Sequence, residues 1–385
     1  MTLIRAKLVK MSPVSSRMSK LLVSSAMLMV LAACGSSKPS PAALESLTPT
    51  VRLTTLWSHR VGSIDGNLIL AVRDGQVTTA SKDGEVVSFE VATGKERWRG
   101  KAGADLTASV GSDGRYAAVV TQANELVAFD QGKVLWRERL PGRVITAPLV
   151  AGERVFIQSV DRSVRAYDVQ NGRWLWQYQR PGGEPLALAN AGVITAFRDT
   201  LLVGQGPRLV GLDPLKGTVR FDLNVGTPRG TNEVERLADL VGPMARVDDE
   251  ACVRTFQLNV ACVELNRGSL RWSKPQAGRQ AVGADQRLVV GADGADRLTA
   301  WKAENGDVLW RADRFTYRNL SAPAVWGNRV VVGDGKDYLH VLAAEDGRTV
   351  GRFELDDPLA AAPVAHGETL LVVTRKGTLY ALRAN

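Results

Sequence analysis

The residue types that commonly perform catalysis or bind metals are sparse in this chain and form no recognisable set. It has 3 cysteines and 3 histidines in 385 residues, and the histidines are scattered, at His59, His340 and His366. Acidic residues recur just before predicted turns, once in most repeats, at Glu90, Asp130, Asp168, Asp213 and Glu264. Such repetition indicates turn structure rather than acid–base pairs. No segment has the spacing of a P-loop, a Gly-x-Ser-x-Gly elbow or a zinc motif, so we predict no catalytic residue, metal site or cofactor.

The first cysteine, Cys34, follows a segment organised like a secretory signal. Five basic residues and no acidic ones precede an apolar stretch, Leu21–Ala33, that is too short to span a bilayer. Residues Leu31–Gly35 resemble the lipobox of bacterial lipoproteins. That resemblance implies cleavage before Cys34, acylation of that cysteine and, with Gly35 as the next residue, sorting to the outer membrane. The alternative is an ordinary signal peptide with an incidental cysteine.

The composition changes to proline and serine after Cys34. We therefore expect residues 1–33 to be the signal peptide, residues 34–50 a flexible tether and residues 51–385 the folded domain. The net charge of +9 depends on the signal: without its five basic residues, 44 Lys and Arg face 40 Asp and Glu, a net charge of +4. These charges are interspersed, and the protein is expected to be secreted. Both points argue against nucleic acid as a partner.

The other two cysteines, Cys252 and Cys262, flank Phe256–Asn259, the predicted turn of a β-hairpin. Their separation of 10 residues around a short turn would put them opposite, or nearly opposite, on paired strands. In an oxidising periplasm the expected state is a disulfide, with two free buried thiols as the alternative.

Glycine and an aromatic residue recur at a fixed spacing, and this repeat determines the predicted architecture. The glycine precedes a tryptophan by four residues in five pairs: Gly94/Trp98, Gly132/Trp136, Gly172/Trp176, Gly268/Trp272 and Gly306/Trp310. Gly217/Phe221 is a sixth copy with phenylalanine, and Gly347/Phe353 is a looser seventh. Alternating apolar runs such as Leu126–Asp130 precede the glycines and are typical of half-buried strands. Each unit is therefore predicted to be strand, tight turn, strand; a helical pair is disfavoured because glycine destabilises helices.

A second strand pair lies upstream in each repeat, so each unit holds about four strands, as in a propeller blade. One example is Ala322–Val325 and Arg329–Val332 around Gly327. The aromatic residues stand at eight positions: 57, 98, 136, 176, 221, 272, 310 and 353. The last strand of the chain lacks an outer partner, which Leu53–Trp57 would supply. We therefore predict an all-β, eight-bladed propeller of four-stranded antiparallel blades, closed by pairing of the N- and C-terminal strands, with seven blades as the alternative.

One interval between aromatic residues, from Phe221 to Trp272, is longer than the others. The surplus lies in Asp222–Gly242, where Thr231 or Asn232 is predicted to cap a short helix. Elaborated loops on a rigid scaffold frequently carry binding function. The alternative is an insertion that packs on its own blade.

The turn Ala92–Trp98, with the sequence Ala-Thr-Gly-Lys-Glu-Arg-Trp, resembles the repeats of pyrroloquinoline-quinone-type propellers. The lipobox, the eight repeats and the segment Asn232–Asp239 are together similar to the BamB family, the lipoprotein subunits of the outer-membrane β-barrel assembly (BAM) machinery. The resemblance extends over essentially the whole chain. It implies a non-enzymatic scaffold, lipid-anchored on the periplasmic side of the outer membrane, that docks on the periplasmic POTRA domains of BamA. The scaffold would assist insertion of outer-membrane proteins, with unfolded outer-membrane proteins as further ligands.

The resemblance also implies a docking surface made of two segments. The matching residues are Leu186 and Leu188 in the first segment, and Glu235, Arg236 and Asp239 in the second. Two positions depart from the family pattern: an expected arginine is Ala189, and an expected acid is Val241. These departures imply a partner contact that is shifted or more apolar.

Two other functions remain open from the sequence. A quinone-dependent dehydrogenase would share the propeller, but such enzymes typically carry adjacent cysteines, which do not occur here. A propeller that binds a glycan through its central channel is the other alternative. Co-purification with BamA would distinguish the scaffold from both.

Overall fold

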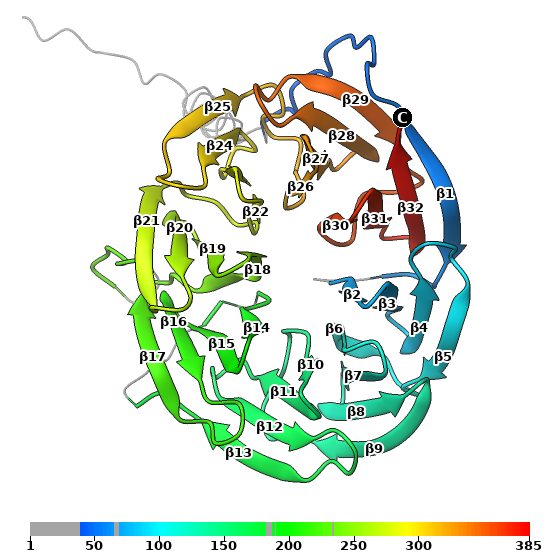
Figure 1. The fold of residues 1–385 in the computed structure, drawn as a ribbon, viewed down its shortest axis with the longest axis vertical. Helices are drawn as coiled ribbons and strands as arrows, with labels where there is room; N and C mark the ends of the chain where they lie inside the picture. The colour runs from blue at the N-terminus through cyan, green and yellow to red at the C-terminus, as the bar shows by residue number, and fades with distance from the viewer. Residues whose placement is uncertain (1–38, 65–68, 182–186, 189, 233–234) are drawn as a thin grey trace, which may run out of the picture. The chain divides into compact units, whose positions relative to one another are not determined.

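Every strand in the described residues belongs to one of eight four-stranded antiparallel sheets. The structure is a computed structural model that describes residues 39–64, 69–181, 187–188, 190–232 and 235–385. The eight sheets are arranged around a central axis as the blades of a propeller (Figure 1). The predicted all-β propeller and its count of eight blades are therefore confirmed, and seven blades are excluded.

The strands follow one another from the centre of the ring outward, and we call the four strands of a blade A to D in that order. Blades 1 to 4 consist of β2 (Ala71–Arg73), β3 (Gln76–Ala80), β4 (Glu85–Glu90), β5 (Glu96–Lys101); β6 (Leu106–Ser112), β7 (Tyr116–Thr121), β8 (Glu125–Asp130), β9 (Lys133–Arg139); β10 (Leu149–Ala151), β11 (Arg154–Gln158), β12 (Val164–Asp168), β13 (Trp174–Tyr178); and β14 (Ile194–Phe197), β15 (Thr200–Gln205), β16 (Arg208–Leu212), β17 (Val219–Asn224).

Blades 5 to 7 repeat this order, and blade 8 takes strand D from the N-terminal end of the domain. Their strands are β18 (Leu240–Val247), β19 (Glu250–Thr255), β20 (Asn259–Glu264), β21 (Ser269–Pro275); β22 (Gly283–Ala284), β23 (Leu288–Ala292), β24 (Leu298–Lys302), β25 (Val308–Ala312); β26 (Ala324–Trp326), β27 (Arg329–Gly333), β28 (Tyr338–Ala343), β29 (Thr349–Glu354); and β30 (Val364–His366), β31 (Thr369–Val373), β32 (Thr378–Ala384), β1 (Leu53–Arg60).

The ring is closed by β1 and β32, the first and last strands of the chain. Their register runs from Leu53 opposite Ala384 to Arg60 opposite Thr378, with one bulge. This pairing was predicted for Leu53–Trp57, and the strand continues three residues further. Because closure uses the two ends of the domain, blade 8 ties them together and no blade lacks its outer strand.

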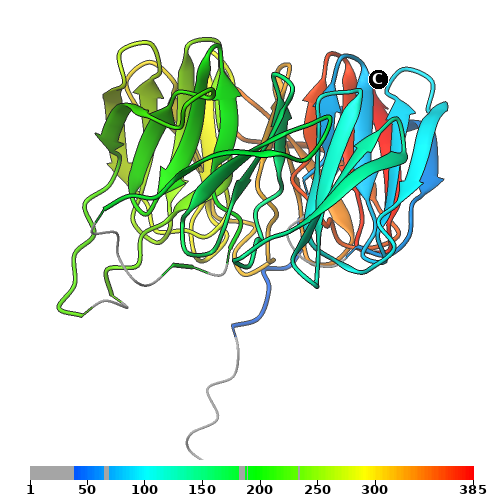
Figure 2. The same ribbon diagram turned by 90° about the horizontal axis from the view of Figure 1, so that it is seen from below.

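Connections of the same kind gather on the same side of the ring, because the strands of each blade alternate in direction. The connection from strand D of one blade to strand A of the next and the B–C turns lie on one face, which we call the D–A face. The A–B and C–D turns lie on the opposite face, which we call the C–D face. In Figure 2 the D–A face is below and the C–D face, which carries the chain's C-terminus, is above.

The repeated glycine and aromatic residues join neighbouring blades. The glycine of a C–D turn packs against the aromatic ring of the preceding blade: a Cβ on Gly172 would lie 2.7 Å from Cδ2 of Trp136. Gly172 also has a φ of +75°, which a residue with a side chain rarely adopts. The same contact occurs at Gly94/Trp57, Gly217/Trp176, Gly268/Phe221, Gly306/Trp272 and Gly347/Trp310. The repeat therefore encodes contacts between blades as well as turns within them.

Each tryptophan of this belt also donates a hydrogen bond to the next blade, with one exception. The indole Nε1 of Trp136 donates to the carbonyl of Val169 at 2.8 Å. The corresponding bonds run from Trp57 to Val91, Trp176 to Pro214, Trp272 to Ala303 and Trp310 to Ala344. Trp98 Nε1 is buried and has no partner among the described residues. The C–D turn of the next blade differs from the others: Gln131 and Gly132 both have positive φ, and only these two residues separate β8 from β9, against five between β4 and β5.

Candidate functional site

Three connections on the D–A face meet at blades 3, 4 and 5. Two are D–A connections, residues 179–193 between β13 and β14 and residues 225–239 between β17 and β18. The third is the B–C turn of blade 3, which contains Arg162. The first two carry the predicted docking residues. Figure 2 shows the described part of the connection 225–239 extending below the body of the ring.

Asp239 holds these three connections together. Its Oδ1 pairs with the Arg162 guanidinium at 2.7 Å, and its Oδ2 accepts a hydrogen bond from the backbone N–H of Leu188 at 2.6 Å. The Asp239 carbonyl accepts from the N–H of Phe256 in the B–C turn of blade 5, at 2.9 Å. The side chains of Arg162 and Asp239 are 13% and 17% exposed. Hydrogen bonds to charged groups contribute roughly 1.5–3 kcal/mol each, so the carboxylate of Asp239 stabilises the arrangement of the two predicted segments.

Glu235 fixes a turn in the connection 225–239. Its carboxylate accepts from the N–H and the hydroxyl of Thr231 at 2.8 and 3.1 Å, and its own N–H donates to Oδ1 of Asn232 at 2.9 Å. The hydrogen bonds from Thr231 hold the pKa of Glu235 below its usual value. The bond from the Arg236 N–H to the Asn232 carbonyl closes a single turn. The predicted short helix is thus wrong for the described residues, although Asn232 does act as its cap would.

The exposed side chain of Arg236, unlike the carboxylates of Glu235 and Asp239, makes no hydrogen bond or ion pair with any described residue. Leu188 is half-buried beside Asp239, whereas Leu186 and Ala189 lie outside the described residues. Val241, where the family pattern expects an acid, is 4% exposed in strand β18 and packs with Ala281 and Ala322. An acid there would be buried, so the apolar residue is consistent with its surroundings.

Arg162 was not predicted as a site residue, although comparison of the B–C turns of the repeats points to it. The fourth residue of comparable B–C turns has a positive φ and is Gly84, Asn124, Asp296, Asp337 or Gly377. Arg162 occupies the same place at a φ of +63°. The left-handed conformation costs a residue with a long side chain about 1–2 kcal/mol. The ion pair with Asp239 offsets that cost, and an arginine at this place in the aligned turns indicates that its side chain is needed.

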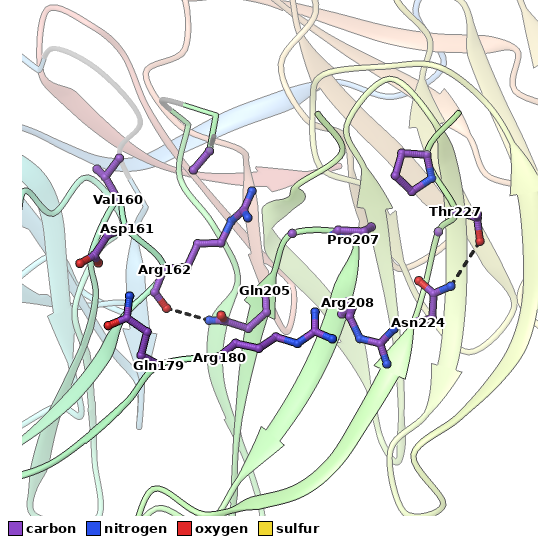
Figure 3. Close-up of a pocket in the computed structure, with 14 residues that line it drawn as sticks. Val160, Asp161, Arg162, Gln179, Arg180, Gln205, Pro207, Arg208, Asn224 and Thr227 are labelled. Carbon is purple, nitrogen blue, oxygen red and sulfur yellow. Dashed lines mark hydrogen bonds between the residues drawn. The ribbon is translucent and has the colours of Figure 1, made fainter. Parts of the chain in front are cut away.

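A cleft of about 420 Å³ lies beside this ion pair, between blades 3 and 4 (Figure 3). Its lining includes the guanidinium groups of Arg162, Arg180 and Arg208. Arg208 and Arg180 share the carboxylate of Asp222, at 2.5 and 3.5 Å. Gln205 Nε2 donates to the Arg162 carbonyl at 3.0 Å, which joins the B–C turns of the two blades. The cleft offers hydrogen-bond donors that suit carbonyl and carboxylate groups of a partner.

The remaining predicted site residues are the three cysteines. Cys34 is outside the described residues. Cys252 on β19 and Cys262 on β20 are directly opposite in register, and their sulfur atoms are within bonding distance. Across the described residues, no three His, Cys, Asp or Glu side chains are grouped to hold a metal ion. Within the same residues, no helix has the length and apolarity to cross a membrane.

Comparison with known proteins gives consistent matches over the whole domain. The family model described as "Outer membrane protein assembly factor BamB" matches residues 82–312 and 303–385. The assembly factor BamB of Burkholderia pseudomallei (strain K96243) is 35% identical over 366 residues, covering 93% of this chain and 96% of the relative. That of Bordetella pertussis (strain Tohama I) is 31% identical over 350 residues, covering 90% of each. The crystal structure of BamB from Moraxella catarrhalis shares the fold, with a TM-score of 0.77 at 22% identity over 86% of this chain and 100% of that one.

Proposed function

The chain belongs to the BamB family of outer membrane protein assembly factors, and from this premise we propose that it is a non-enzymatic scaffold subunit of the BAM complex. It docks on the periplasmic POTRA domains of BamA through the D–A face at blades 3 to 5. Docking assists the folding and insertion of outer-membrane proteins. An acyl group on Cys34 holds it on the periplasmic side of the outer membrane.

The observation that carries the docking proposal is the pair of bonds made by Asp239. Leu188 and the connection 225–239 are separated by a whole blade in the sequence, yet the Asp239 carboxylate bonds to the backbone of Leu188 directly. This bond places the described residues of the two proposed docking segments next to each other, which supports the proposal that both contact the same partner. Asp239 and Glu235 position this surface, because their carboxylates are engaged within the chain.

Arg236 is available to contact a partner. It is exposed and unpaired among the described residues, and the turn fixed by Glu235 determines where it projects. The neighbouring arginines of the cleft would add donors for the backbone carbonyls or carboxylates of the partner. Half-buried Leu188 would supply apolar area at the same place.

Co-purification from detergent-solubilised membranes tests the proposal. The native protein should retain BamA. Arg236→Glu should lower that retention without changing thermal unfolding, because Arg236 makes no contact that the ring needs. Arg173→Glu is the matched control, since Arg173 is exposed on the C–D face of blade 3. Equal loss of BamA in both variants, or no BamA with the native protein, would refute the assignment; retention of a glycan instead would favour a channel-binding propeller.

A further inference from the structure

The segment before β1 lies against blade 7. The N–H of Ala42 donates to the Thr316 carbonyl at 2.9 Å, and the Arg318 guanidinium donates to the Ala42 carbonyl at 2.8 Å. Thr316 and Arg318 belong to the D–A connection between β25 and β26. The start of this segment is therefore bound at the D–A face, where a flexible tether was expected.

Arg318 is itself anchored inside the blade. Its Nε and Nη2 donate to the Asp334 carboxylate at 2.8 and 2.6 Å, and the same oxygen of Asp334 contacts His340 Nε2 at 2.9 Å. All three side chains are buried. A buried ion pair with satisfied geometry holds the guanidinium in one orientation. The hydrogen bond that Arg318 directs at Ala42 is thus presented by a fixed group.

Further contacts follow the segment across the outside of blade 7. The Glu45 carboxylate pairs with Arg314 at 3.2 Å. The backbone carbonyl of Glu45 accepts a hydrogen bond from Arg352 at 3.3 Å. The N–H groups of Thr50 and Val51 both donate to the Val350 carbonyl of β29, each at 2.9 Å. Figure 1 shows this segment in dark blue outside β29. We call residues 42–51 the strap.

Because of the strap, the N-terminal segment leaves the ring from the D–A face instead of the C–D face. Strand β1 begins at Leu53, opposite Ala384 at the end of β32, and that end lies on the C–D face. Without the strap, the preceding chain would leave from the C–D face. With it, the chain passes along the outside of blade 7 and leaves at Ala42, which is bound to the D–A connection between β25 and β26. In Figure 2 the dark-blue segment accordingly emerges below, on the side of connection 225–239.

We infer that the strap turns the D–A face at blades 6 and 7 toward a lipid surface. This inference rests on the proposed acylation of Cys34. Cys34 precedes Ala42 by eight residues, which span at most ~29 Å when fully extended. If the chain were free up to Leu53, nineteen residues could span ~68 Å. The strap thus keeps the bilayer within a short distance of the D–A face, and the docking surface shares that face.

Energy transfer to labelled vesicles tests this orientation. A fluorophore is placed on the acylated protein at Lys336→Cys on the D–A face or at Glu345→Cys on the C–D face; both residues are exposed and belong to blade 7. Vesicles of phosphatidylethanolamine and phosphatidylglycerol carry the lipid acceptor. Transfer from position 336 should exceed transfer from position 345. Equal transfer, or stronger transfer from position 345, would overturn the inference.

A strap-release variant provides the second measurement. Ala42→Pro removes the N–H bonded to Thr316, and in Gly351→Ala the new Cβ would lie 2.5 Å from the Val51 carbonyl oxygen. The double variant should lose hydrogen-exchange protection at residues 42–51 and lose the difference between the two labels. Gly294→Ala is the control, because a Cβ there meets nothing within 4 Å. A strap whose amides exchange freely in the native protein would also overturn the inference.

The outcomes separate this inference from the proposed function. Mass spectrometry of the purified protein reports whether Cys34 carries acyl chains. An unmodified Cys34 would overturn the membrane orientation together with the anchor, while BamA retention would still report on docking. Acylated protein that retains BamA but shows equal transfer from both labels would overturn the orientation alone.

Discussion

Arg162 and Asp239 stand 77 residues apart in the sequence, and their side chains form an ion pair at 2.7 Å. This pair connects the B–C turn of blade 3 to the connection that enters blade 5. The same carboxylate accepts a hydrogen bond from the backbone N–H of Leu188, in the connection between β13 and β14. The proposed docking surface therefore depends both on the packing of neighbouring blades and on the hydrogen bonds of Asp239.

Replacing Arg162 tests whether its ion pair positions the loops for binding without contributing much to the stability of the ring. In Arg162→Asn the ion pair is lost, worth roughly 1.5–3 kcal/mol, but asparagine tolerates the left-handed φ that costs arginine about 1–2 kcal/mol. We expect little change in thermal unfolding and a loss of BamA affinity of about tenfold, which corresponds to 1.4 kcal/mol.

Arg297→Asn is the control for this variant, since Arg297 forms an exposed pair with Asp293 on the same face of blade 6. Exposed pairs contribute little. Titration calorimetry and hydrogen exchange of residues 225–232 and 235–239 would measure both effects. Native affinity together with native protection in Arg162→Asn would show that the pair does not position the surface.

The contact between Gly172 and Trp136 of the preceding blade predicts that a side chain at position 172 lowers the free energy of unfolding. Gly172→Ala brings a Cβ to 2.7 Å from the Trp136 ring, whereas Gly152→Ala, in the A–B turn of the same blade, meets nothing within 4 Å. Both glycines have positive φ, at +75° and +57°. Both variants should lose about 1–2 kcal/mol from backbone strain, and Gly172→Ala should lose a further 1–3 kcal/mol from overpacking. An equal decrease in the free energy of unfolding of the two variants, measured in urea, would show that close packing against Trp136 does not require glycine at position 172.

The paired cysteines predict a redox-dependent stability. If Cys252 and Cys262 are bonded, alkylation of the denatured protein without reductant should leave both unmodified. After reduction, alkylation should modify both thiols. Replacing both by alanine should lower the free energy of unfolding by roughly 2–3 kcal/mol, because the bond closes a loop of 10 residues. Alkylation of both thiols in the unreduced, denatured protein would instead support the alternative of free buried thiols.

The buried groups of blade 7 predict loss of stability in acid. Burial lowers the pKa of His340 below its usual value of 6.5, and this effect outweighs the bond to Asp334, which raises the pKa. The unfolded chain therefore takes up a proton at higher pH than the folded one, and stability falls as the pH drops below 6.5. Burial alone would raise the pKa of Asp334, but bonds from His340, Lys336 and Arg318 lower it to about 2. Stability contributed by Asp334 is thus lost between its usual pKa of 3.8 and about 2.

His340→Gln tests the first of these steps. Glutamine can still donate to Asp334 but does not titrate. The variant should show a flatter dependence of the urea midpoint on pH just below 6.5 than the native protein, with the step at lower pH retained. Identical slopes in the two proteins would remove His340 from the acid response.

The architecture was predictable because the strand and turn pattern is visible within each repeat. Runs such as Leu126–Asp130 alternate with period two, and eight aromatic positions give eight blades. The partner of each glycine was not predictable from the same pattern. Gly94 precedes Trp98 by four residues, but in the ring it packs on Trp57 of the preceding blade. A sequence repeat fixes which residues recur, whereas the contact between repeats depends on how neighbouring sheets pack.

The site was predictable only in part, for the same reason. The long interval after Phe221 and the resemblance to the family led to the prediction of two docking segments, but spacing could not show that Asp239 bonds to Leu188. The short helix expected after Thr231 or Asn232 is not found in the described residues, where Glu235 instead bonds back to Thr231. The strap was hidden because Pro- and Ser-rich composition indicates flexibility, while its contacts with Thr316, Arg318 and Val350 are distant in the sequence.

The central claim is that the D–A face at blades 3 to 5 binds BamA, and equilibrium binding tests it most directly. The native protein, Arg236→Glu and Arg173→Glu are titrated with the purified POTRA domains of BamA from the same organism. We predict saturable binding for the native protein and for Arg173→Glu, with affinity lowered about tenfold or more in Arg236→Glu, the loss expected for about 1.4 kcal/mol. Equal affinity in all three proteins, or no binding by the folded native protein, would contradict the account.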